Sequence, residues 1–123
     1  MRVLLSDLYG AGASTTAALI EWGMVDLLQN PDADRFIPER FVGGEIRSYL
    51  GQDFEMIPFG LGHRICPGMP LAQKLIPLLL GTLLHCFEWE LPAEVRESGI
   101  DMKEKCGVVL SLVNPLTALP KEI

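Results

Sequence analysis

The sequence predicts a mainly α protein with two long helices, a long loop region between them and a small C-terminal β-hairpin. Apolar residues recur at helical spacing over about residues 4–30 and again over 70–87. Between these segments, residues 31–58 are rich in Gly, Pro and charge. Near the C-terminus, an apolar run is followed by an Asn-Pro turn signal and a second apolar stretch. The length is that of one domain.

The first predicted helix is apolar around nearly its whole circumference. Its main stripe, at steps of three and four residues, consists of Leu4, Leu8, Ala11, Thr15, Ala18, Trp22 and Val25. A narrow polar line of Asp7, Ser14 and Glu21 lies only about 80° from that stripe, and other large apolar residues fill the remaining face. Pro31 ends the helix. A helix of this kind is normally buried inside a large protein.

The second predicted helix begins at Pro70, a residue suited to a first helical turn. Its leucines give the helical period, and it too has little polar face. Pro77 interrupts it, so we expect a kink there. Two such helices cannot bury each other completely in a chain this short, and we therefore expect it to be part of a larger fold. The alternative is a small helical domain that oligomerises.

The C-terminal segment, residues 106–120, is predicted to form the β-hairpin. Its first strand is the apolar run Val108–Val113, Asn114-Pro115 forms the turn, and Leu116–Leu119 returns as a short strand. The acidic residues that precede it are expected to form a solvated face, and they are Glu94, Glu97, Asp101 and Glu104.

Composition excludes several function classes. A net charge of −6 and a pI near 4.8 argue against nucleic-acid binding, which requires a basic face. No uninterrupted apolar stretch reaches the length of a membrane span, and the N-terminus does not resemble a secretory signal. The 3 cysteines are odd in number and form no Cys-x-x-Cys pair, so neither a disulfide framework nor a zinc ribbon fits. We expect an intracellular protein.

Residues 59–68 combine residue types that suit a haem-thiolate site. Cys66 precedes a helix N-terminus, whose amides and dipole stabilise a thiolate. Gly62 and Gly68 allow tight turns and a close approach of the backbone to a flat macrocycle. Arg64 offers donors for a propionate, and Phe59 can shield the sulfur from water. For an isolated cysteine, a buried thiol in a Gly-rich turn would be the better interpretation.

The pattern Phe-x-x-Gly-x-Arg-x-Cys-x-Gly is matched at every fixed position of residues 59–68, and this segment resembles the cytochrome P450 family. The sequence Gly-His-Arg-Ile-Cys-Pro-Gly is similar to that of plant microsomal members of this family. The resemblance implies a partial P450 fold over residues 1–123, with haem b as cofactor and Cys66 as the proximal iron ligand.

Residues Ala11–Thr16 resemble the oxygen-binding helix of the same family, which the resemblance places over residues 1–30. By position, Thr15 would relay protons to dioxygen. Ser14 stands where the family has an acid, so proton delivery departs from the family's pattern.

Pro38-Glu39-Arg40-Phe41 resembles the family's Pro-Glu-Arg-Phe loop. The arginine of that loop normally meets a Glu-x-x-Arg helix, yet no Glu in this sequence is followed by Arg three residues later. We therefore expect an internal deletion beside an N-terminal truncation, and a solvated Arg40.

The resemblance implies a monooxygenase that inserts one oxygen atom of dioxygen into a small lipophilic substrate, with electrons from NADPH-cytochrome P450 reductase. It also implies the endoplasmic reticulum membrane, although we expect the anchor to be absent from this chain. The alternative is a non-catalytic truncated product with weak or no haem binding, which we favour for the isolated chain because the distal side of its haem would be open to water.

Overall fold

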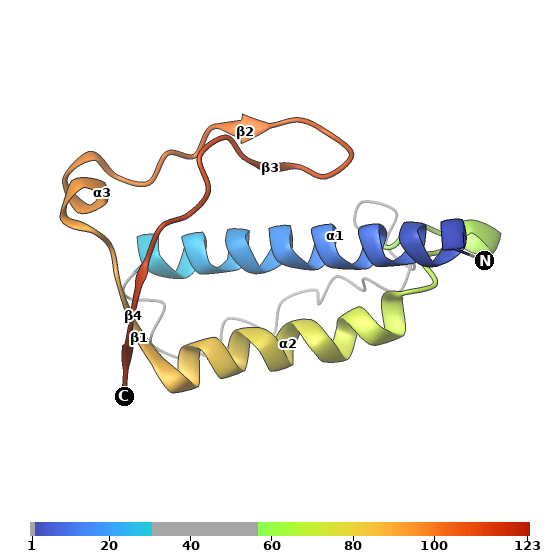
Figure 1. The fold of residues 1–123 in the computed structure, drawn as a ribbon, viewed down its shortest axis with the longest axis horizontal. Coiled ribbons are helices and arrows are strands. Elements are labelled where there is room, and N and C mark those ends of the chain that lie inside the picture. Colours follow the sequence, from blue (N-terminus) through green and yellow to red (C-terminus); the bar gives the residue numbers. More distant parts are fainter. Residues whose placement is uncertain (1, 31–56) are drawn as a thin grey trace, which may run out of the picture.

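The structure is a computed structural model that describes residues 2–30 and 57–123 of the chain. Its helices are α1 (Arg2–Gln29), the 3₁₀ turn η3 (Gly62–Arg64), α2 (Met69–Cys86) and α3 (Ala93–Ser98), and its strands are β1 (Phe87–Glu90), β2 (Glu104–Lys105), β3 (Ser111–Leu112) and β4 (Leu119–Glu122) (Figure 1). The predicted mainly α class is confirmed. The Pro38–Phe41 loop, Arg40 and most of the predicted 31–58 loop region lie outside the described residues.

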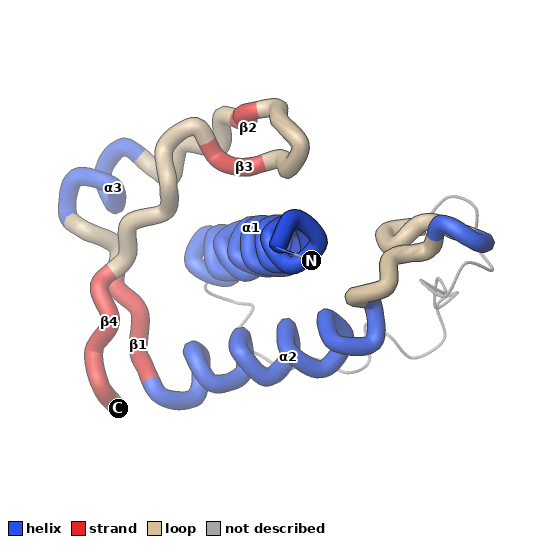
Figure 2. Tube along the Cα trace, turned by 45° about the vertical axis from the view of Figure 1, so that its right-hand side comes forward, coloured by secondary structure: helices blue, strands red, loops and turns tan. Residues whose placement is uncertain are grey.

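Helix α1 occupies the centre of the arrangement. Seen almost end-on, it lies between α2 on one side and the hairpin of β2 and β3 on the other (Figure 2). It packs closely on α2 at Gly23, because a Cβ at this position would lie 3.5 Å from the Leu80 side chain. The only buried residues of α1 are the next two, Met24 and Val25. The most enclosed part of α1 is therefore its C-terminal part, which includes the close approach to α2 at Gly23.

Helix α2 begins directly after the cysteine loop, with Pro70 in its first turn as predicted. Pro77 lies inside it, where it removes one backbone donor. The helix ends at Cys86 because Phe87 adopts an extended backbone, with φ −136° and ψ 136°. The chain then continues straight into β1, so helix and strand are adjacent without a connecting loop.

The C-terminal strands differ from the predicted hairpin over residues 106–120. A small antiparallel hairpin is present, but it pairs β2 with β3 and its first strand begins at Glu104. The returning segment near Leu119 pairs instead with β1, antiparallel, with Phe87 opposite Glu122. We attribute this pairing to Trp89, whose Nε1 donates to the Leu83 carbonyl at 3.0 Å and whose ring packs edge-on against Phe87. These contacts hold β1 beside the end of α2, where its unpaired edge is available to β4.

The core is small. Within residues 2–30 and 57–123, the buried hydrophobic residues are Met24, Val25 and Leu112. Large apolar side chains of α1 remain exposed, and Tyr9, for example, is 79% exposed. The expectation that the two long helices cannot bury each other is therefore confirmed. By length and composition, each of these helices would also suffice to cross a membrane, a test that core helices of soluble proteins pass as well.

Candidate functional site

The segment before α2 folds into a closed loop. The amide of Cys66 donates to the carbonyl of Phe59 at 2.8 Å, and the amide of Gly60 donates to the carbonyl of Ile57 at 3.0 Å. Gly60 and Gly62 have φ angles of 73° and 65°, in the left-handed region that residues with a Cβ rarely adopt. These two glycines let the chain turn back so that Cys66 returns to the start of the loop.

The thiol of Cys66 lies at the N-terminal end of α2. The helix begins at Met69, and the amide of Met69 donates to the Cys66 carbonyl at 3.3 Å. A Cβ on Gly68 would lie 3.7 Å from the Cys66 Sγ, so the absence of a side chain at Gly68 leaves space on that side of the sulfur. Cys66 is exposed. An accessible sulfur at the positive end of a helix is well placed to act as a thiolate ligand.

The structure brings together the predicted cofactor-binding residues, which are Phe59, Gly62, Arg64, Cys66 and Gly68, in this one loop. Phe59 is half-buried and Arg64 is exposed on η3. Among the described residues, no group of three or more His, Cys, Asp or Glu side chains offers a multi-ligand metal site. A haem-thiolate site requires an accessible thiol as the iron ligand, small residues that let the macrocycle approach, and a guanidinium that can bind a propionate. The residues of this loop provide all three and therefore fit haem.

The residues predicted to handle protons lie in the middle of α1. The hydroxyl of Thr15 donates to the carbonyl of Ala11 at 2.6 Å, and the hydroxyl of Ser14 donates to the carbonyl of Gly10. Both side chains are thus held against their own helix, as hydroxyls often are when they occupy a helix interior.

Thr15 also lines a shallow groove of about 400 Å³ between α1 and the β2–β3 hairpin. The other lining residues are Ala18, Leu19, Trp22, Glu104, Val109 and Leu110. Cys66 is not among them. Thr15 and residues of the β2–β3 hairpin therefore line the same groove, which the sequence did not predict.

Two side chains that follow Thr15 on α1 reach the C-terminal segment. Trp22 Nε1 donates to the carbonyl of Leu110 at 3.3 Å, and the Glu21 carboxylate accepts the amide of Leu116 at 3.0 Å. Sequence reasoning placed Trp22 in the apolar stripe and Glu21 in the polar line, and gave neither a partner. The sequence feature that could have indicated these contacts is the adjacent indole and carboxylate, because each carries a polar atom that needs a hydrogen-bond partner when it is partly buried.

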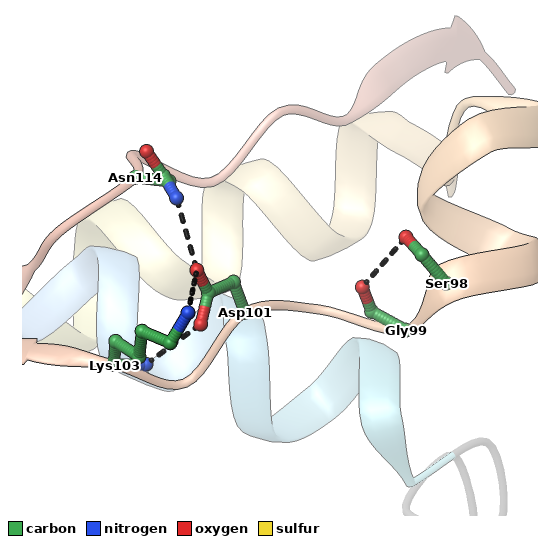
Figure 3. A network of polar contacts seen from close by, with 5 residues as sticks. All are labelled: Ser98, Gly99, Asp101, Lys103 and Asn114. Atoms are coloured by element: carbon green, nitrogen blue, oxygen red, sulfur yellow. Dashed lines mark hydrogen bonds and ion pairs between the residues drawn. The ribbon is translucent and has the colours of Figure 1, made fainter.

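A second polar network closes the other end of the hairpin (Figure 3). The Asp101 carboxylate accepts the backbone amide of Lys103 at 3.1 Å and the side-chain amide of Asn114 at 2.9 Å. The bond from the Lys103 amide is the main reason that the pKa of Asp101 lies below its usual value, with smaller contributions from Asn114 and the Lys103 charge. Asp101 thus holds two strands of chain together, whereas the sequence predicted only a solvated acid.

Comparison with known proteins gives a consistent assignment. The family described as Cytochrome P450 matches residues 31–117. Geraniol 8-hydroxylase of Catharanthus roseus is 48% identical over 92 residues, which is 75% of this chain and 18% of the relative. Lauric acid 10-hydroxylase of Petunia hybrida is 50% identical over 95 residues, 77% of this chain and 16% of the relative. Oryzalexin E synthase of Oryza sativa subsp. japonica is 40% identical over 121 residues, 91% of this chain and 23% of the relative. The chain thus spans about a fifth of the length of these plant relatives.

Proposed function

The chain belongs to the cytochrome P450 family, and from this premise we propose that it is the haem-thiolate segment of a monooxygenase in which Cys66 is the proximal iron ligand. The observation that carries the proposal is the closed loop: the bond from the Cys66 amide to Phe59 presents an exposed thiol at the start of α2. Haem, when bound, would supply the chemistry, which is insertion of one oxygen atom of dioxygen into the substrate.

The chain's own residues would perform the binding and proton handling. The Cys66 sulfur, exposed at the start of α2, would hold the iron as its thiolate ligand. Arg64, exposed on η3, would hold a haem propionate through its fork of donors. Phe59, half-buried beside the loop, would limit the access of water to the sulfur.

Thr15 is proposed to pass protons toward dioxygen. Its hydroxyl donates to the carbonyl of Ala11, which leaves its oxygen lone pairs free to accept a hydrogen bond from a proton donor. Ser14 occupies the position of the acid but carries a hydroxyl that donates to Gly10, so it supplies no ionisable proton near neutral pH. We therefore expect slow proton delivery, and Ser14→Asp should accelerate turnover if haem and reductase are provided.

The substrate and the redox partner also belong to this proposal. The relatives' names describe hydroxylation of geraniol and of lauric acid, both small lipophilic molecules with one polar end. We propose a substrate of the same class for this protein, electrons from NADPH-cytochrome P450 reductase, and a location at the endoplasmic reticulum membrane.

One observation favours a second function for the isolated chain. The groove beside Thr15 is shallow, and many large apolar side chains of both long helices are exposed. Water would reach a bound haem from the open side, so activated oxygen would be lost before transfer. The competing proposal is therefore a non-catalytic product that binds haem weakly or not at all.

A carbon monoxide difference spectrum tests the proposal. The chain is supplied with haem, reduced and exposed to carbon monoxide, and the strongly red-shifted Soret band of a thiolate-ligated iron is measured. The haem-thiolate proposal predicts this band in the wild type and in Cys86→Ser, whose cysteine is also exposed, and its loss in Cys66→Ser, whereas the competing proposal predicts no band in any of them. If the folded wild-type chain gives no such band, or if Cys66→Ser retains it, the haem-thiolate proposal is wrong.

A further inference from the structure

We infer that Ser98, the last residue of α3, is a phosphorylation site for a protein kinase that selects acidic segments, and that its phosphorylation destabilises α3. This inference goes beyond the haem-thiolate proposal. It involves no residue of the cysteine loop or of the groove beside Thr15, so either can fail without the other.

Acidic residues lie on both sides of Ser98 in the sequence. Glu97 precedes it, Glu94 lies one helical turn earlier, and Asp101 lies three residues after it. Ser98 is the only one of the nine serine and threonine residues in the sequence that has an acid three positions later. Kinases distinguish substrates partly by charge pattern, and a kinase with a basic substrate groove would therefore select Ser98 over the other hydroxyls.

The Ser98 hydroxyl is accessible to an enzyme. Ser98 is exposed, and its hydroxyl donates to the carbonyls of Glu94 at 2.8 Å and of Gly99 at 3.2 Å (Figure 3). The oxygen therefore keeps its lone pairs for attack on a phosphorus atom. The Asp101 side chain is also 36% exposed, although it bonds Asn114, so its charge remains available for recognition.

The segment around Ser98 can open locally. Helix α3 has only 6 residues, a length at which an isolated helix is marginal in water. Gly99 follows it with a φ of 79°, and the chain from Ile100 to Lys103 forms neither helix nor strand. A short exposed element of this kind opens at low cost, which lets the segment enter a kinase in an extended conformation.

The reaction takes ATP as the phosphoryl donor. The Ser98 oxygen forms a bond to the γ-phosphorus, and the bond between that phosphorus and the bridging oxygen of the leaving ADP breaks. The hydroxyl proton passes to the catalytic base of the kinase.

A phosphate on Ser98 is unfavourable for α3. Ser98 lies at the C-terminal end of the helix, where the dipole disfavours anions, and Glu94 and Glu97 already contribute two negative charges. The dianionic phosphate also carries no proton for the Glu94 carbonyl, so that hydrogen bond is lost. Arg96, the only cation of α3, donates to the Leu91 carbonyl before the start of the helix.

Incubation of the full chain with casein kinase II and ATP tests the site. We expect mass spectrometry to locate one phosphate, on Ser98, and none in Ser98→Ala. Asp101→Asn should lower the initial rate about tenfold or more, because it removes the charge that the kinase recognises. Asn114→Ala is the matched control: it removes a partner of the Asp101 carboxylate but keeps the charge, so the rate should not fall.

Amide hydrogen exchange tests the effect on α3. The Arg96 amide donates to the Pro92 carbonyl at 2.9 Å, and its exchange should accelerate about fivefold in the phosphorylated chain. Ser98→Glu should give a smaller acceleration, because its carboxylate carries less charge than the phosphate. The Gly60 amide, which donates to Ile57 in the cysteine loop, should exchange at an unchanged rate.

Phosphate at another residue in place of Ser98, or no phosphate at all, would overturn the assignment of the site. An Asp101→Asn rate equal to that of the wild type, or an equal loss of rate in Asn114→Ala, would overturn recognition through the acidic charge. Unchanged Arg96 exchange in the phosphorylated chain would overturn the effect on α3 alone.

Discussion

Replacement of Gly62 by alanine isolates the backbone conformation on which the cysteine loop depends. Gly62 has a φ of 65°, and a Cβ built there meets nothing within 4 Å. The substitution therefore introduces no clash, and its whole cost is the left-handed conformation. For a residue with a Cβ this cost is about 1–2 kcal/mol. The loop that closes between Phe59 and Cys66 should open about 5 to 30 times more often.

Hydrogen exchange of the Cys66 amide measures this opening directly, because the bond to the Phe59 carbonyl protects it. We expect exchange of this amide to accelerate about 5- to 30-fold in Gly62→Ala. Gly68→Ala is the matched control: Gly68 has a φ of −81°, and its added Cβ would make only an ordinary 3.7 Å contact with the Cys66 Sγ. It should leave the Cys66 exchange rate unchanged.

The reasoning is refuted if Gly62→Ala exchanges at the wild-type rate, or if Gly68→Ala accelerates exchange equally. In the first case the left-handed turn would carry no cost, and in the second the effect would come from side-chain volume. A haemin titration of the wild type and of Gly62→Ala extends the test, since a loop that opens more often should bind haem correspondingly more weakly.

Three further outcomes follow from the packing and the charges. Gly23→Ala should raise the free energy of unfolding by about 1 kcal/mol in urea titrations, because alanine favours the helix and its Cβ would contact Leu80 at an ordinary 3.5 Å. A loss of stability would contradict this prediction and would show that the packing of α1 on α2 does not accommodate the added methyl group. Lowering the pH should weaken the loop that Asp101 closes, because the depressed pKa of Asp101 makes its contribution complete above about pH 4 and lost as pH falls through the folded value. The protection of the Lys103 amide, measured relative to its intrinsic exchange rate at each pH, should therefore fall in acid, and this fall should be absent in Asp101→Asn. The wild-type chain should self-associate in light scattering through its exposed apolar faces, and Leu8→Glu should reduce this association; a monodisperse wild-type monomer would contradict the expectation.

The sequence determined the helices and the cysteine loop because their signals are local. The helical period of the leucines and Pro70 before them predicted α2, and Pro31 marked the end of α1 within two residues. Glycines at fixed offsets from Cys66 predicted tight turns, and Gly62 adopts the positive φ that only glycine takes without cost. The spacing of these residues was also sufficient to indicate the family, which the comparisons show.

Only the tertiary structure decided the pairing of the strands and the partners of α1. Leu119 follows a turn signal and could pair with any exposed edge, and it joins β1 because Trp89 fixes that strand beside α2. The bonds of Glu21 and Trp22 span more than eighty residues of sequence, a distance over which no periodicity or turn signal carries information. Strand pairing and long-range hydrogen bonds depend on which surfaces come into contact after the helices form. A single sequence indicates which surfaces are apolar or polar, but it does not indicate which of them will contact each other.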